Sequence, residues 1–225
     1  SNVLVGGQAG DALTTGVHNI AIGRDALSTE DAHGYNVAIG GYALQDQDAG
    51  ANAYNVAIGY QAGTDVSTGI NNTLLGGFAG DALTTGSYNV ALGYEALSGE
   101  DTGTRSIAIG YFALRAQNYN GEALNVGIGH LAGTAITSGI QNVIIGGLAG
   151  DALITGGANI AIGYHALGTA NTDESQNVAI GAYSLHAMDN GSTTNTHNTA
   201  VGYYSGVSVT TGRQNTILGA LTGDA

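Results

Sequence analysis

The sequence contains no cysteine, proline, tryptophan or lysine, and these absences remove several classes of protein from consideration. A chain without Cys has no disulfide scaffold, no thiolate zinc site and no Cys nucleophile. Four basic residues, all Arg, stand against 17 carboxylates and leave a formal net charge of −13. Such an acidic chain repels phosphate backbones, so we expect no nucleic-acid partner. No apolar run approaches the length of a membrane span, so we expect no membrane insertion.

Glycine, by contrast, is abundant, with 39 of 225 residues, and it belongs to a phrase that recurs thirteen times. The phrase reads Asn, a β-branched residue, a small or aliphatic residue, an aliphatic residue and Gly. Most repeats are 17 residues long, and Ser106 replaces the Asn in one of them. The other twelve begin at Asn2, Asn19, Asn36, Asn55, Asn72, Asn89, Asn125, Asn142, Asn159, Asn177, Asn198 and Asn215. Each unit is too short to bury its own apolar face, so the units must stack.

The repeats are of two types. Counting from the anchoring Asn as position zero, one type has Leu at position eight, as at Leu27. The other has Gly there and an aliphatic residue at position eleven, as at Gly10 and Leu13. Their order is Gly, Leu, Leu, Gly. This order divides the single domain 1–225 into super-repeats 2–71, 72–141 and 142–214 and a partial one, 215–225.

The pattern predicts an all-β fold, a parallel β-solenoid (β-roll or β-helix) of about 13 coils in four-coil super-repeats. Period-two alternation places positions one and three, such as Val37 and Ile39, on one side of a strand, where we expect them to fill the core. The Gly at position four predicts a corner with positive φ, followed by a second short strand. The stacked Asn anchors predict a structural hydrogen-bonded ladder.

Position two is then expected to point away from the core. A solvent-facing strand usually carries polar residues there, but this column is apolar and uncharged. We therefore predict that it forms a subunit interface. A charge at Ala108 is expected to break the assembly, and a charge at Val90 to collapse the coil. The proposed interface consists of Leu4, Ala21, Ala38, Ala57, Leu74, Ala91, Ala108, Ile144, Ala161, Ala179, Ala200 and Ile217.

Two phrases carry a resemblance to known repeats: Asn55-Val-Ala-Ile-Gly-Tyr-Gln-Ala-Gly63 and Asn89-Val-Ala-Leu-Gly-Tyr-Glu-Ala-Leu97. They are similar to the head repeats of trimeric autotransporter adhesins and more similar to repeats of phage and prophage tail fibres. The resemblance covers essentially the whole chain. It implies an extracellular homotrimer of solenoids on a surface appendage. The longer coils and the four-coil period depart from the adhesin pattern and favour a tail fibre.

The leading hypothesis is a structural and adhesive segment of a trimeric phage-type tail fibre, a stiff rod whose loops contact a host-surface glycan or protein. The loops in the third coil of each super-repeat, which we call the third-coil loops, are the longest: Gln45–Tyr54, Arg115–Leu124 and His186–His197. Recognition usually resides in loops on a rigid scaffold. The candidate receptor residues are Asp46, Asp48, Asn118, Tyr119, Asp189, Asn190 and Asn195. The alternatives are a bacterial or environmental surface adhesin or extracellular filament on the same solenoid, and an ice-binding solenoid. Ice binding needs an unbroken ladder of Thr residues on a flat face. Here the Thr pairs, such as Thr14-Thr15 and Thr84-Thr85, occur only in the Gly-type coils, so the ladder is interrupted.

The sequence gives no basis for an enzyme, a cofactor or a metal site. The Gly-rich phrases lack the helix that a dinucleotide site requires. The six His residues share no column and no ligand spacing, so neither a catalytic triad nor a metal site is expected. Acidic pairs recur in the second coil of each super-repeat, with too few oxygen ligands for Ca²⁺, and are expected to be solvated loops. These pairs are Glu30-Asp31, Glu100-Asp101 and Asp173-Glu174.

Overall fold

The computed structural model describes residues 1–169, 173–189 and 195–223. In these ranges the chain forms thirteen three-residue strands and no helix. The strands are β1 (Val3–Val5), β2 (Ile20–Ile22), β3 (Val37–Ile39), β4 (Val56–Ile58), β5 (Thr73–Leu75), β6 (Val90–Leu92), β7 (Ile107–Ile109), β8 (Val126–Ile128), β9 (Val143–Ile145), β10 (Ile160–Ile162), β11 (Val178–Ile180), β12 (Thr199–Val201) and β13 (Thr216–Leu218).

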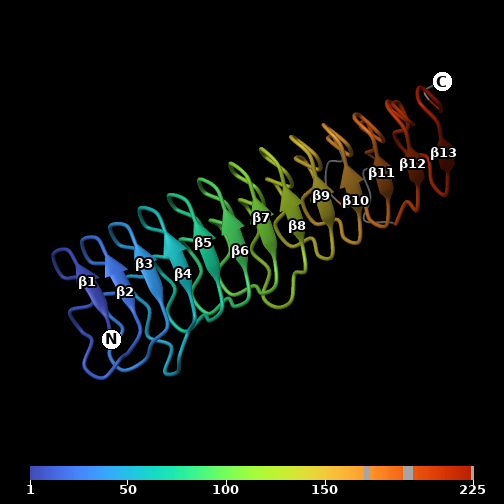
Figure 1. The fold of residues 1–225 in the computed structure, drawn as a ribbon. Coiled ribbons are helices and arrows are strands. Elements are labelled where there is room, and N and C mark those ends of the chain that lie inside the picture. The colour runs from blue at the N-terminus through green and yellow to red at the C-terminus, as the bar shows by residue number, and fades with distance from the viewer. Residues whose placement is uncertain (170–172, 190–194, 224–225) are drawn as a thin grey trace. The chain divides into compact units, whose positions relative to one another are not determined.

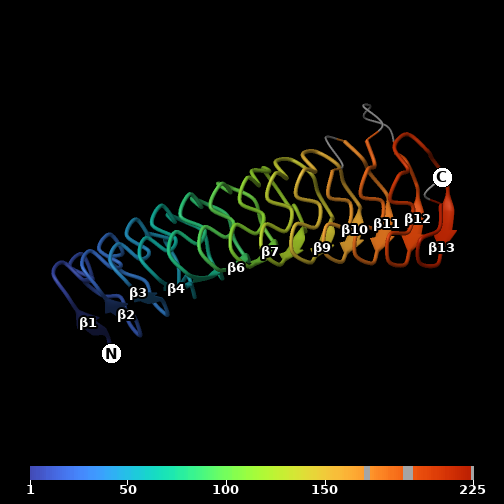
Figure 2. The same ribbon diagram turned by 90° about the horizontal axis from the view of Figure 1, so that it is seen from above.

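The chain divides into two compact units, and the parallel β-solenoid predicted from the sequence is confirmed in each. The first unit comprises Ser1–Ile109 with Asn118–Glu122 and contains β1 to β7, paired in parallel in chain order. The second comprises Gly110–Gln117 and the described residues after 122, and contains β8 to β13 in the same arrangement (Figure 1). Figure 2 shows the strands of each unit along one side of the coils and the loops along the other.

The register pairs equal positions of successive coils. Val37, Ala38 and Ile39 lie opposite Val56, Ala57 and Ile58, and the neighbouring strands repeat this pairing. Within each unit, every strand position of the sequence repeat is therefore a column of neighbouring residues in space.

The corner glycine has the predicted positive φ. At Gly76 φ is +138°, a conformation that L side chains rarely adopt. A Cβ on Gly76 would also lie 2.5 Å from the carbonyl oxygen of Gly93 in the next coil. Both the backbone conformation and the close approach of adjacent coils therefore require glycine here.

The second strand predicted after the corner is wrong. The chain turns there instead, and the N–H of Ala26 donates to the carbonyl oxygen of Gly23, three residues earlier, at 3.4 Å. Ala26 is nevertheless fully buried. The column of small residues at position seven thus faces the core from a turn, and backbone hydrogen bonds still join successive turns, as from the N–H of Leu27 to the carbonyl oxygen of Ala43 at 3.0 Å.

The predicted orientation of the strand is also wrong. In β3 the central Ala38 is 0% exposed, whereas Val37 and Ile39 are only half-buried. The column assigned to a subunit interface therefore lines the interior of its own coil. Fully buried in this way are Ala21, Ala38, Ala57, Leu74, Ala91, Ala108, Ile144, Ala161, Ala179 and Ala200. Leu4 is 43% exposed and Ile217 half-buried because β1 and β13 each have a neighbouring strand on one side only.

Size explains this orientation. The space between a strand and the turn that faces it is narrow, so the smaller side chains of the strand go inside. At Gly127, the central residue of β8, even a Cβ would lie 2.6 Å from Cγ of Leu114. The side chain of a buried Leu from the preceding coil already fills that place, so any residue larger than glycine would clash.

The same packing accounts for the four-coil period. Gly63 and Gly80 occupy position eight of two successive Gly-type coils, and Leu74 fills the space that both leave. A Cβ on Gly63 would lie 2.6 Å from Cδ1 of Leu74, and one on Gly80 would lie 2.8 Å from Cδ2. Ile144 packs in the same way near Gly150. The large residues predicted to project toward sister chains instead complete the core where neighbouring glycines leave room.

The Leu-type coils place their core residue in an unfavourable backbone conformation. Leu97 has φ +56°, the value that Gly80 has at the equivalent position of the preceding coil. A left-handed conformation costs a non-glycine residue about 1–2 kcal/mol. Burying a Leu side chain contributes about 1.5–3 kcal/mol, which offsets that cost because Leu97 is fully buried.

The Asn anchors form a buried ladder that joins side chain to backbone. The backbone N–H of Asn72 donates to Oδ1 of Asn55 at 2.8 Å, and Nδ2 of Asn72 donates to the carbonyl oxygen of Gly86 at 2.8 Å. The side-chain oxygen of each anchoring Asn thus bonds to the backbone of the next coil. Its side-chain amide bonds to a carbonyl oxygen at the end of its own coil. Ser106, which replaces the Asn in one coil, still donates its backbone N–H to Oδ1 of Asn89 at 3.0 Å. The bond from the preceding coil is therefore kept without the Asn side chain.

Candidate functional site

The outward positions one and three of each strand form two apolar columns, which we call the outer face. Every residue of these columns is Val, Ile, Leu or Thr, and none is buried. The outer face carries no charge along either unit. Its most exposed large side chains are Val3, Val5, Leu75, Leu92, Ile107 and Leu218.

Aromatic side chains border the outer face of the first unit on both sides. Before the anchors, the rings of His18, Tyr35 and Tyr54 stack with successive centroids 5.0 Å apart. After the corners, Tyr60 and Phe78 pack edge to face at 5.5 Å, a favoured arrangement of aromatic pairs. The first column was missed in the sequence, although a signal was present, since Tyr or His directly precedes several anchoring Asn residues.

A cluster of titratable residues lies in the second unit. The rings of His165 and His186 pack edge to face at 5.5 Å. Burial lowers the pKa of His186, nearby His165 lowers it further, and Asp151 opposes both. Burial likewise raises the pKa of Asp151, against the effect of the two His residues. No ligand spacing along the chain joins these three residues, because they come from three successive coils.

The loop residues proposed for receptor contact are mostly exposed. Asp46, Asp48, Asn118 and Asn195 are exposed, and Tyr119 and Asp189 are half-buried. Asn190 lies outside the described residues. Two of these loops fold onto neighbouring coils: the N–H of Asp48 donates to the carbonyl oxygen of Ser67 at 2.9 Å, and the N–H of Tyr119 donates to the carboxylate of Glu100 at 3.3 Å.

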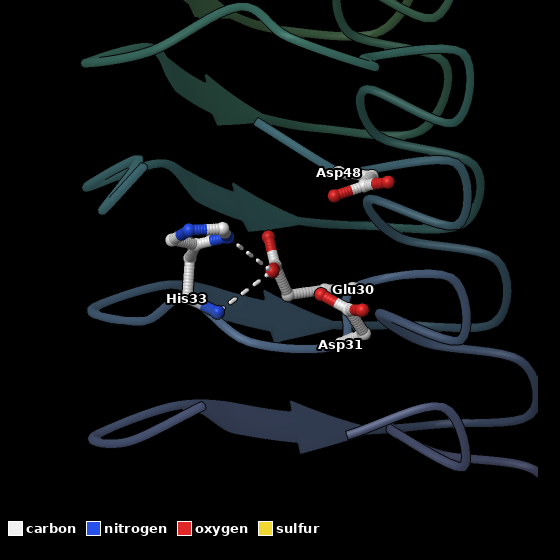
Figure 3. Close-up of side chains that lie close together, drawn as sticks. All are labelled: Glu30, Asp31, His33 and Asp48. Atoms are coloured by element: carbon white, nitrogen blue, oxygen red, sulfur yellow. Dashed lines mark hydrogen bonds and ion pairs between the residues drawn. The ribbon is translucent and has the colours of Figure 1, made fainter. Parts of the chain in front are cut away.

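Asp48 joins one of the acidic pairs in a compact cluster with Glu30, Asp31 and His33 (Figure 3). One potential ligand atom from each residue lies within 4.8 Å of the others. Oε1 of Glu30 accepts the backbone N–H of His33 at 2.9 Å and lies 3.3 Å from its Nδ1. Glu30 is 0% exposed, as are Glu100 and Glu174, so the expectation of solvated loops is wrong for the Glu of each acidic pair.

The sequence contained a signal for this cluster that was not recognised. Asp48 follows Asp31 by one coil length of 17 residues, so stacking brings the two carboxylates together. Ligand spacing along the chain does not reveal the cluster, because Asp48 is one full coil away from the other three residues in the sequence.

The described residues enclose no pocket, and they include no helix that has the length and hydropathy to span a membrane. Comparison with protein-family models, curated protein sequences and solved structures finds no match to this chain.

Proposed function

We propose that this chain is a structural and adhesive segment of a phage-type tail fibre, extracellular and assembled as a homotrimer. The β-solenoid fold is consistent with such a role. The observation that carries the proposal is the outer face, because it is apolar, uncharged and unpaired within the chain over every strand. Surfaces of this kind on soluble proteins are usually interaction sites.

The outer face has the chemistry of a subunit interface. Its aliphatic columns supply apolar area, and the bordering Tyr rings pack against one another while their hydroxyls remain able to reach water. Tyr54 and Tyr60 are each about half exposed, so their rings retain area for contact with another chain. The likeness of the repeats to those of trimeric fibres favours three copies.

The first test is the mass of the protein in solution. Sedimentation or light scattering is expected to give three times the 22.3 kDa of one chain. Replacement of Val56 and Ile58 in β4 by Lys places charges on the outer face and is expected to give folded monomers. The matched control Thr68→Lys changes an exposed loop residue and is expected to remain trimeric. A wild-type monomer, or a trimer that tolerates both strand substitutions, would contradict this interface.

The adhesive part of the proposal concerns the third-coil loops. Labelled trimer is expected to bind saturably to the surface of a susceptible bacterium and to compete with adsorption of the phage. Ala replacement of Asp46 and Asp189 is expected to weaken binding without changing the mass of the trimer. If the trimer binds no bacterium in a broad panel, the chain is structural only.

The alternative is a surface adhesin or filament built on the same solenoid. The flanking sequence of the gene discriminates the two. A virion-attachment region and a chaperone tail support the fibre, whereas a signal peptide and a membrane anchor support the adhesin.

An ice-binding role is disfavoured because Thr hydroxyls donate hydrogen bonds to other groups of the same chain. The hydroxyl of Thr84 donates to the carboxylate of Asp101, and that of Thr137 donates to the carbonyl oxygen of Ile154 at 3.3 Å. These hydroxyls are therefore already paired, and we expect no thermal hysteresis from the purified protein.

A further inference from the structure

We propose that Glu30, Asp31, His33 and Asp48 bind one divalent first-row transition-metal cation of the Mn²⁺–Zn²⁺ series. The four residues come from two successive coils of the first unit, with Glu30 between His33 on one side and the two Asp carboxylates on the other (Figure 3). A bound ion would join these coils through their side chains, in addition to the Asn ladder.

The buried carboxylate of Glu30 is the first reason. Glu30 is 0% exposed, and its Oε2 atom has no hydrogen-bond partner among the described residues. A buried oxygen without a partner is costly, and more so on a charged group. A cation bound at Oε2 removes this cost, which neither His33 nor the backbone does.

The charge of the cluster is the second reason. Three carboxylates lie within a few ångströms of one another, and His33 is the only basic group among them. The guanidinium groups of Arg24 and Arg105 pair with Asp25 and Glu122 instead. In a chain with a net charge of −13, mutual repulsion of these carboxylates is best relieved by a bound cation.

The donor set selects the kind of ion. Carboxylate oxygens suit Mg²⁺, Ca²⁺ and Mn²⁺, whereas imidazole suits Zn²⁺ and other transition metals. Ca²⁺ takes six to eight oxygen ligands, so a four-residue set that includes a His is a poor calcium site. Four donors of this mixed type match zinc coordination. Asp31 and Asp48 are exposed, so their side chains have room to rotate toward an ion bound at Glu30.

The second super-repeat provides a natural counterpart without the ligands. Glu100 stands where Glu30 does, but Gly103 and Asn118 replace His33 and Asp48. The carboxylate of Glu100 accepts the N–H of Gly103 at 2.8 Å and that of Tyr119 at 3.3 Å. Two backbone N–H groups thus donate to the carboxylate of Glu100. In the first super-repeat we place a cation at the equivalent carboxylate of Glu30. The coils also fold with Gly and Asn at these positions.

The counterpart supplies the test variant. His33→Gly with Asp48→Asn converts the cluster to the composition of the second super-repeat and is expected to fold, which circular dichroism checks. Calorimetric titration of the full chain, without a polyhistidine tag, uses ZnCl₂, MnCl₂ and CaCl₂. We expect one Zn²⁺ or Mn²⁺ per chain, bound at least tenfold more tightly than Ca²⁺. The double variant is expected to lose at least tenfold in affinity, and the control Asp101→Asn to lose none.

Two further measurements locate the ion. Added Co²⁺ is expected to give visible absorption bands in the wild type that the double variant lacks. Zn²⁺ is expected to raise the melting temperature of the wild type and leave that of the double variant unchanged, because only a ligand of the folded state stabilises it. Absence of binding, binding that the double variant retains, or Ca²⁺ binding as tight as that of Zn²⁺ and Mn²⁺ would overturn the proposal. None of these outcomes depends on the mass of the assembly.

Discussion

The two faces of strand β5 carry the same residue type in different surroundings. Leu74 is 0% exposed and fills the core, whereas its neighbour Leu75 is 38% exposed on the outer face. In eight strands the inner residue is Ala, and the outer residues of these strands are Val, Ile, Leu or Thr. Along these strands small and large apolar residues alternate. The polarity of a residue therefore does not indicate whether its side chain faces the core or the outer face.

The inner face is restricted because the turns opposite the strands already fill the interior. In the coil of β6, Ala91 on the strand and Ala96 and Leu97 on the turn are all 0% exposed, so the three side chains share the interior. The outer face has no such limit within the chain. Substitutions that exchange the two faces are expected to differ sharply in effect.

The largest effect is expected for a charge on the inner face. Ala91→Glu buries a carboxylate that has neither room nor a partner, so we expect a loss of at least several kcal/mol and failure to fold. Val90→Glu, one residue away on the outer face, is expected to leave a folded chain and to disrupt association. Circular dichroism and light scattering on the pair give the result. Equal loss of structure in both variants would contradict the assigned orientation.

The next effect compares the two leucines. Leu74→Ala is expected to lower the free energy of unfolding by about 2–5 kcal/mol because it leaves a cavity in the core. Leu75→Ala removes a half-exposed side chain and is expected to cost less than about 1.5 kcal/mol, with a part that depends on protein concentration. Denaturant unfolding at two concentrations measures both. A larger loss for Leu75→Ala would place the principal packing on the outer face.

A smaller effect is expected at the corner. Gly76→Ala introduces a Cβ against the backbone of the next coil in a left-handed conformation, which we expect to cost about 1–3 kcal/mol. Gly77→Ala is the matched control, since its Cβ would meet nothing closer than 3.5 Å, at the ring of Tyr94. Thermal unfolding of the two variants is expected to separate them by several degrees. Equal melting temperatures would contradict close coil stacking.

The smallest effect is expected at Asp81, a half-buried side chain that lies neither fully in the core nor fully in solvent. Burial raises the pKa of Asp81 to about 6, with nearby Asp65 and Glu95 adding to the shift and backbone hydrogen bonds opposing it. Because this pKa exceeds the ordinary Asp value of 3.8, the folded chain binds more protons than the unfolded chain between about pH 4 and 6 and loses stability as pH rises through that window.

Asp81→Asn removes this ionisation. At pH 7.5 it is expected to stabilise the chain by about 1 kcal/mol after allowance for solvent screening, and the gain is expected to vanish below pH 4. Urea unfolding across this pH range tests the prediction. Asp11→Asn, at the exposed equivalent position, serves as the control. A gain that does not change with pH would show that Asp81 is ionised without penalty.

Several features of the fold were predictable because they repeat. The stacking of coils, the position of each strand and the glycine of each corner follow from columns such as Gly6, Gly23 and Gly40, and the structure agrees with them. The inward face of the strand was not predictable from alternation. All three residues of β3, Val37, Ala38 and Ile39, are apolar. The general tendency to bury the larger aliphatic residues therefore predicted Val37 and Ile39 in the core, whereas Ala38 is the buried residue.

The candidate metal site shows the same limit. The acidic pairs and His33 are evident in the sequence, but their spacing along the chain does not resemble that of metal ligands. The approach of Asp48 to Asp31 follows from their 17-residue spacing, whereas the burial of Glu30 and its contact with His33 depend on the local fold of the loop and do not follow from the repeat.

The sequence by itself determined that the chain winds into stacked coils, because each short unit has an apolar face that only its neighbours can cover. Only the tertiary structure decided which side chains occupy the interior, because volume and not polarity separates Ala from Val there. It also decided that Glu30 is buried in contact with His33, because that arrangement depends on the local fold of the loop.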